Sequence, residues 1–100
     1  NTYNINPEKL EDFNEFFHKF IYPYYLSCGA RLLGRWVNAS KTEILAIWEY
    51  NSMEEYREIE REIMSSNFQK VANIRRKELG ALYIKSHQEL LTSTGHYKNN

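Results

Sequence analysis

Two stretches in the middle of the chain alternate between apolar and polar residues, as the strands of a β-hairpin do. ARLLGRWVN and TEILAIWEY lie within residues 30–50 and are separated by ASK, the length of a short hairpin turn. A three-residue turn pairs Asn38 with Thr42, so that even-numbered residues lie opposite even-numbered residues. In this register Arg31 lies directly across from Glu49, where opposite charges attract. The pattern therefore predicts a hairpin with two chemically different faces.

The two faces of the predicted hairpin differ in how many charged residues they carry. The even-numbered face consists of Ala30, Leu32, Gly34, Trp36, Ile44, Ala46, Trp48 and Tyr50. The odd-numbered face consists of Arg31, Leu33, Arg35, Val37, Glu43, Leu45, Ile47 and Glu49. We expect helices to cover the first face, because it is almost wholly apolar. The second face has too many aliphatic side chains for a free surface. We therefore expect it to form a homodimer interface, with its arginines paired or at the rim.

A helix is predicted before the hairpin. Asn6 followed by Pro7 is a typical helix start, with an N-cap residue and a proline at the first helical position. A wide apolar stripe then recurs at steps of three and four residues: Leu10, Phe13, Phe17, Phe20 and Tyr24. Pro23 lacks a backbone donor, and we expect it to end or kink the helix near residues 21–24.

Two further helices are predicted after the hairpin. Ser52 and Glu55 have the spacing of a capping box at the start of the first one. The buried stripe of this helix would be Tyr56, Ile59 and Ile63. A second, shorter helix is predicted over residues 68–78, with Gly80 ending it. Its packed residues would be Phe68, Val71 and Ile74.

The order of the predicted elements indicates a single α+β domain over residues 1–100. Short strands are predicted over residues 2–5, where Tyr3 and Ile5 share a face, and within residues 81–91. The elements therefore run β-α-β-β-α-β, with an extra short helix before the last strand. This order is typical of the ferredoxin-like fold, an antiparallel sheet with helices on one face.

Composition and charge exclude several classes of partner. Thirteen basic and thirteen acidic residues leave no net charge, which argues against nucleic-acid binding. No apolar run approaches the roughly 20 residues that cross a bilayer, and no signal peptide opens the chain. We therefore expect a cytoplasmic protein without membrane contact. Cys28 is the only cysteine and the three histidines are scattered, so we expect no disulfide, no metal site and no cofactor.

Aromatic residues make up 15% of the chain, and many of them fall on the first helix and the hairpin. A mostly apolar cleft with one or two polar groups is the usual form of a small-molecule site. We therefore predict that a small apolar or aromatic molecule binds between this helix and the even-numbered face of the hairpin. The lining would be Phe13, Phe17, His18, Tyr24, Trp36 and Trp48. The same residues also suit a filled core, so a ligand-binding protein or small enzyme and a non-catalytic structural or regulatory dimer are both compatible with the pattern.

The segments GARLLGRWVN, EILAIWEYNSMEEY and LLTSTGHY together resemble the NIPSNAP-like proteins of the dimeric α+β barrel superfamily. The most specific part is Gly34 and Trp36, followed at a fixed distance by Trp48, Tyr50 and Ser52. The resemblance covers nearly the whole chain and implies a homodimer whose two sheets pack face to face. Some relatives in that superfamily are cofactor-independent monooxygenases or haem-degrading enzymes, and others have no known activity. The resemblance therefore implies a fold and an assembly, and no catalytic residue is carried over from it.

Overall fold

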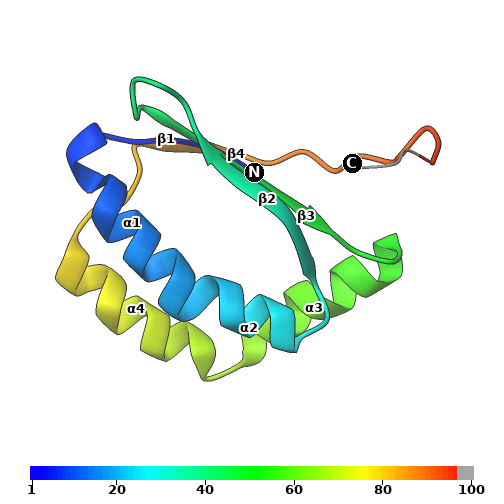
Figure 1. Cartoon of the computed structure of the whole chain (residues 1–100). Helices are drawn as coiled ribbons and strands as arrows, with labels where there is room; N and C mark the ends of the chain where they lie inside the picture. Colours follow the sequence, from blue (N-terminus) through cyan, green and yellow to red (C-terminus); the bar gives the residue numbers. More distant parts are fainter. Residues whose placement is uncertain (97–100) are drawn as a thin grey trace.

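The computed structural model describes residues 1–96 and contains a four-stranded antiparallel sheet with the helices on one side of it (Figure 1). The strands lie in the order β2-β3-β1-β4, so that β1 pairs with both β3 and β4. This arrangement is ferredoxin-like and confirms the α+β fold predicted from the sequence. Within the described residues, no helix is both long enough and apolar enough to cross a membrane.

The elements follow the predicted order along the chain. The strands are β1 (Thr2–Asn4), β2 (Arg31–Val37), β3 (Glu43–Glu49) and β4 (Lys85–His87). Between β1 and β2 the chain forms η1 (Pro7–Lys9), α1 (Leu10–Phe16), η2 (Phe17–Ile21) and α2 (Tyr22–Ser27), which follow one another without a break. Between β3 and β4 it forms α3 (Met53–Ser65) and α4 (Phe68–Leu79).

The first helical segment continues through Pro23. Its backbone widens into a π-helix over η2, which ends two residues before the proline. Proline has no N–H to donate and its ring crowds the preceding turn, and a wider π-helical turn accommodates both effects. The helix therefore does not end near residues 21–24 but reaches Ser27. Gly29, at a φ of 105°, then turns the chain into β2, a conformation that glycine adopts readily.

At the start of α3 the Ser52 half of the predicted capping box is formed, whereas the Glu55 carboxylate binds Asn51 in place of the Ser52 backbone N–H. The backbone N–H of Glu55 donates a 3.0 Å hydrogen bond to Ser52 Oγ, and the Glu55 carboxylate accepts one of 2.8 Å from the Asn51 side chain. Ile59 and Ile63 are buried, as the apolar stripe predicted. The local sequence is thus sufficient to define where this helix begins and which side of it packs.

The buried side of α4 is not the one that its large apolar residues predicted. Val71 and Ile74 are 54% and 63% exposed, whereas Ala72 is completely buried. This helix lies against α1, and Arg75 donates a 2.6 Å hydrogen bond to the Glu15 carboxylate across the contact. A small side chain allows two helices to approach closely, so the alanine occupies the contact and the larger residues face outward.

The hairpin pairs as predicted only at its open end. Arg31 lies opposite Glu49, and its Nε donates to the Glu49 carboxylate at 2.9 Å. The register then shifts by one residue, because Leu33 is unpaired and Gly34 lies opposite Ile47. This irregularity is a β-bulge. The predicted pairing of even with even residues is therefore wrong for the rest of β2.

The bulge exchanges the two faces of β2 beyond it. Arg35 lies opposite the buried Ala46 and Val37 lies opposite the buried Ile44. Residues directly opposite in a sheet point to the same face, so Arg35 and Val37 point toward the helices. Both had been expected on the uncovered face, and this expectation is wrong.

Trp36 lies on the uncovered face, opposite Leu45, and is 52% exposed. Its indole covers Gly34, since a Cβ atom built on this glycine would lie 2.4 Å from the ring atoms Cζ2 and Cη2. Without a side chain at this position, the ring can lie against the backbone of its own strand. The expectation that helices cover Trp36 is therefore also wrong.

The last strand is shorter than the segment 81–91 that was expected to contain it. The three residues of β4 pair with β1, which is itself three residues long. Leu82 is buried before β4, whereas Leu91 is 81% exposed after it, so apolar residues on either side do not extend the ladder. Residues 97–100, which include the tyrosine of the LLTSTGHY segment, lie outside the described residues.

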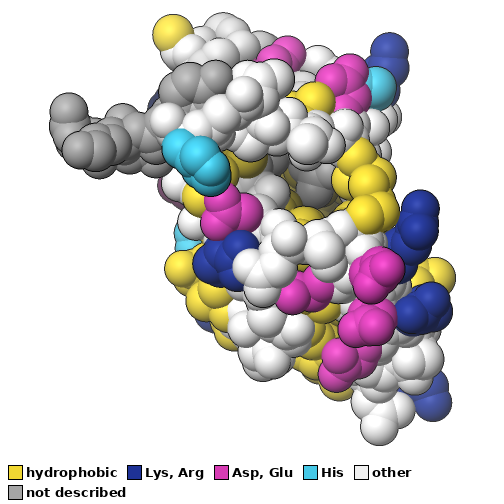
Figure 2. Space-filling model, turned by 90° about the vertical axis from the view of Figure 1, so that its right-hand side faces the viewer, with side chains coloured by type: hydrophobic (Ala, Val, Ile, Leu, Met, Phe, Trp, Pro, Cys, Tyr) yellow, Lys and Arg dark blue, Asp and Glu magenta, His cyan; other side chains and the backbone are white. Residues whose placement is uncertain are grey.

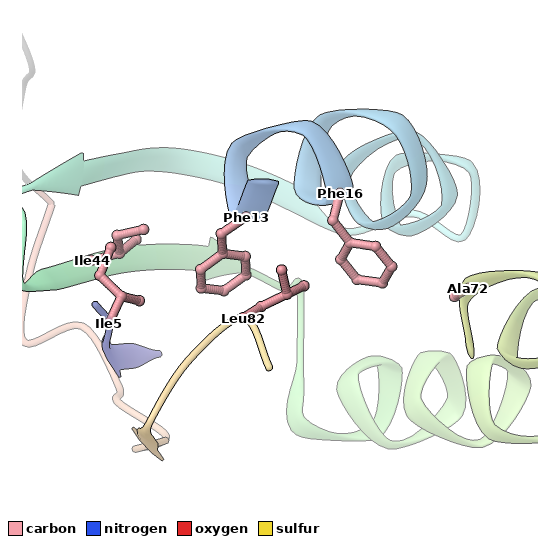
Figure 3. Packing of buried hydrophobic residues seen from close by; sticks show 6 residues of the cluster. All are labelled: Ile5, Phe13, Phe16, Ile44, Ala72 and Leu82. Atoms are coloured by element: carbon pink, nitrogen blue, oxygen red, sulfur yellow. The ribbon is translucent and has the colours of Figure 1, made fainter. Parts of the chain in front are cut away.

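The buried side chains form two clusters on the helix side of the sheet. The larger one consists of Ile5, Phe13, Phe16, Ile44, Ala72 and Leu82 (Figure 3). The smaller one consists of Ala30, Ile59 and Ile63. Phe68, at the start of α4, packs against both clusters. The larger cluster thus lies near β1, and the smaller one lies near the start of β2.

Substituting Gly34 tests the placement of the indole. We expect Gly34→Ala to lower the free energy of unfolding by about 1 kcal/mol, because the new Cβ and the Trp36 ring compete for the same space. In a Trp36→Ala background the same change should not destabilise the protein, since alanine restricts the unfolded chain more than glycine does. Urea unfolding of the four proteins measures this coupling. An equal effect in both backgrounds would contradict the contact.

Candidate functional site

The molecule is hollowed between the sheet and α3. Figure 2 shows this side, with hydrophobic side chains inside the hollow. The helix α3 packs against α4, and Gln88, in the chain that follows β4, donates a 2.8 Å hydrogen bond to the Tyr56 hydroxyl on α3. We call this space the α3 cleft and assign to it a set of polar side chains linked by ring contacts: Tyr3 packs on Phe13, Arg35 lies over Phe13 and Phe17, Tyr25 packs on Trp48, and Tyr50 packs on Tyr56. Glu60, on the same helix as Tyr56, is assigned to the set as well.

Three phenols border the α3 cleft from three separate parts of the fold. Tyr3 belongs to β1, Tyr25 belongs to α2 and Tyr50 directly follows β3. Burial raises the pKa of each phenol above its ordinary value. Within residues 1–96, none of these three hydroxyls has a hydrogen-bond partner, although none is sealed from solvent. The hydroxyls are therefore available to a molecule that enters the cleft.

Glu60 brings a carboxyl group to the same space from α3. It is half-buried, and burial raises its pKa above the ordinary value for glutamate. Its negative charge also contributes to the raised pKa of Tyr3, Tyr25 and Tyr50. Glu60 forms no ion pair among the described residues, so nothing in this part of the chain neutralises it.

Arg35 borders the cleft from the sheet, and its guanidinium lies against the first helix. Its Cζ lies 4.3 Å from the ring centroid of Phe17 and 5.1 Å from that of Phe13, which are cation–π distances. One nitrogen, Nη1, donates a hydrogen bond to the Asn14 side chain. The other, Nη2, is buried and has no partner within residues 1–96. Burial lowers the pKa of Arg35, while the proximity of Tyr3 opposes this effect.

Three of the six residues predicted to line a ligand site lie together between helix and sheet. Phe13 and Phe17 are buried, and the Phe17 ring lies 6.0 Å from the indole of Trp48. Trp48 in turn lies 5.0 Å from the ring of Tyr25, at the border of the cleft. The bulge places Trp36 on the opposite face of the sheet, so the two tryptophans cannot bind one molecule within a subunit.

The remaining two predicted residues are not among the side chains assigned to the α3 cleft, although Tyr24 packs against the cluster of Ala30, Ile59 and Ile63. His18 is exposed, and its Nδ1 donates a 2.8 Å hydrogen bond to the backbone oxygen of Asn14. Tyr24 stacks on Phe68 with ring centroids 4.2 Å apart. It also borders a separate surface pocket of about 320 Å³ between α2 and the start of α4. Neither residue supplies the polar contact that was expected of it in the predicted site.

Sequence reasoning missed the polar side chains that the fold brings to the cleft. Glu60 was not among the residues predicted to pack from its helix, although it is four residues after Tyr56 and therefore shares its side. That spacing was a usable signal. Tyr3 and Arg35 had no such signal, because their proximity depends on sheet pairing and on the bulge.

The chemistry that these groups support is binding. The cleft has aromatic walls, free hydroxyls and two charged groups of opposite sign, which suits a small molecule with a polar end. Partial burial raises the pKa of the Cys28 thiol, so this residue is a poor nucleophile. In residues 1–96 no three histidine, cysteine, aspartate or glutamate side chains are grouped to hold a metal ion.

Comparison with known proteins identifies a family. The family model described as NIPSNAP matches residues 1–95, which is nearly the whole chain. The comparisons with curated proteins and with solved structures found no match.

The environment of Glu60 has a consequence for stability that depends on pH. Because its pKa is raised in the folded state, the uncharged form is favoured by folding, and ionisation opposes folding as the pH rises through the folded-state value. Glu60→Gln should therefore raise the melting temperature at pH 7 by a few degrees and leave it unchanged near pH 4.

Glu58→Gln, at an exposed position of the same helix, is the matched control and should have the same small effect at both pH values. Thermal unfolding followed by circular dichroism provides the measurement. A Glu60→Gln protein that is less stable than the wild type at pH 7 would contradict the assignment of Glu60 to the cleft.

Proposed function

The chain belongs to the NIPSNAP family, and from this premise we propose that it is a homodimer that binds a small apolar or aromatic molecule in the α3 cleft of each subunit. The observation that carries the proposal is the set of unpartnered polar groups in an aromatic hollow. Within residues 1–96 the hydroxyls of Tyr3, Tyr25 and Tyr50 have no protein partner, and Arg35 has a buried nitrogen without one. A buried guanidinium nitrogen usually has a partner, and a bound molecule would supply it.

A filled structural core accounts less well for these features. A core evolved only for packing gains stability when polar groups are absent or fully hydrogen-bonded. The smaller buried cluster includes Ile59 and Ile63 of α3 and packs against Tyr25, Trp48 and Tyr50, so the polar groups lie beside apolar walls. Binding of a small molecule would give the polar groups that lack a partner within residues 1–96 a common cause.

The homodimer is proposed from the uncovered face of the sheet. Its exposed apolar residues are Leu33, Trp36, Leu45 and Ile47. They lie side by side on two paired strands, so a second copy placed across a twofold axis would cover them with the same residues. The opposite charges of Arg31 and Glu49 at one end of the strands are already paired within a subunit. Such a face avoids repulsion between copies. Two sheets packed in this way form a dimeric α+β barrel.

We also propose a cytoplasmic location. Cys28 is a free thiol without a disulfide partner, which suits a reducing compartment. Fractionation of cells that produce the full-length protein tests this assignment.

A charge on the uncovered face should separate the subunits. Leu45→Glu places a carboxylate in the proposed interface, which should bury about 1,200–2,000 Å² in total. We expect the wild type to elute as a dimer in size-exclusion chromatography with light scattering, and the variant as a monomer or as aggregate. Val71→Glu changes another exposed aliphatic residue, on α4, and should leave the dimer intact. A wild type that stays monomeric at micromolar concentration would contradict the proposal.

Ligand binding should change the fluorescence of Trp48. We would screen haem, flavins, quinones and aromatic acids against a Trp36→Phe protein. We expect at least one compound to quench its tryptophan fluorescence saturably and to raise its melting temperature. The Trp48→Phe protein retains the tryptophan on the opposite face of the sheet and should be quenched less. A panel that changes neither fluorescence nor melting temperature would favour a filled core.

A further inference from the structure

We propose that the molecule bound in the α3 cleft carries a carboxylate group, which binds the guanidinium of Arg35, and an aromatic or aliphatic body, which packs among the tyrosines. This inference rests on the proposed function and specifies the class of its ligand. It concerns the end of the cleft at which the sheet and the first helix meet.

The first argument is that Arg35 lacks a negative partner. Within residues 1–96 the only hydrogen bond of its guanidinium is the one from Nη1 to Asn14, and no carboxylate lies within ion-pair distance of it. Arg31 and Arg75 each pair with a glutamate, and the other arginines without a described ion pair, Arg57, Arg61 and Arg76, are exposed to solvent. A buried cation without a counter-charge is unfavourable, and an acidic ligand would remove that penalty.

The second argument is geometric. The flat guanidinium lies over the Phe17 ring at 4.3 Å, so the helix restricts the group to one plane. The hydrogen bond to Asn14 holds Nη1. The donors that are left, on Nη2 and Nε, lie in the plane of the group. This in-plane edge is the one to which a carboxylate binds with two parallel hydrogen bonds. Arg35 is therefore oriented before any ligand arrives.

The third argument concerns the position of Glu60. Among the described residues it does not pair with Arg35, so these two opposite charges do not neutralise each other. A ligand with one carboxylate can bind Arg35 while its uncharged body extends toward Tyr25 and Glu60. A second anionic group at the far end would meet the Glu60 carboxylate and be repelled. The cleft thus favours monocarboxylic acids over dicarboxylic acids.

A pair of probes that differ only in charge tests this inference. We would titrate the protein with 2-naphthoic acid and with 2-naphthamide, its neutral analogue of nearly the same shape, by isothermal calorimetry at pH 7. We expect the acid to bind at least tenfold more tightly than the amide. Arg35→Gln should remove this preference, because the acid should bind more weakly while binding of the amide changes little. Arg31→Gln, on the opposite face of the sheet, should keep the preference.

The melting temperature of the ligand-free protein shows whether Arg35 has only a structural role. Arg35→Met keeps the bulk of the side chain and removes the unpaired charge, so its melting temperature should equal or exceed that of the wild type. A marked fall in melting temperature would show that Arg35 serves the fold, and would overturn the inference.

The outcomes also separate this inference from the proposed function. Equal, saturable binding of acid and amide would overturn the inference and leave the proposed cleft standing. Failure of both probes and of the wider panel would overturn both. Acid-selective binding that survives in the Arg35→Gln protein would likewise overturn the role of Arg35, since the selectivity would then come from another group.

Discussion

The pairing of β2 with β3 shifts by one residue at Leu33, and the placement of the neighbouring side chains depends on this shift. With the bulge, Arg35 lies opposite Ala46 on the helix side, and Trp36 lies opposite Leu45 on the uncovered side. Without the bulge, Arg35 would lie on the apolar uncovered face of the sheet. The Trp36 indole would then occupy the space beside the first helix. A side chain in a strand points to one face or the other, so a single inserted residue exchanges everything that follows it.

The two faces of the sheet acquire different roles from that exchange. The uncovered face gains a large aromatic side chain, which covers Gly34 and adds apolar area for a second copy of the chain. The helix face gains a positive charge that the aromatic rings of Phe13 and Phe17 hold in place. The opposite side of the cleft has the carboxyl group of Glu60, which stays separate from that positive charge. In our proposal this separation is what permits a polar ligand between them.

Features that depend on neighbouring residues in the sequence were predictable, and features that depend on close packing were not. The N-cap at Ser52 and the helix end at Gly80 follow from local backbone requirements. The bulge was signalled only by Gly34, and a glycine in a strand is compatible with several local structures. The burial of Ala72 in place of Val71 depends on how closely α4 approaches α1, which no hydrophobic stripe specifies. For the same reason the aromatic residues of the site were partly foreseen, but its polar groups were not.

The most direct test of the account is the environment of Arg35 in solution, as observed by nuclear magnetic resonance. If the bulge is correct, the Arg35 side-chain protons lie beside the Phe17 ring. They should then show nuclear Overhauser contacts to that ring, and ring currents should shift their signals upfield. The protons of the Trp36 indole should show contacts to the Gly34 Hα atoms. Contacts from Arg35 to Leu45, together with contacts from Trp36 to the first helix, would contradict the account, because they require the hairpin register without the bulge.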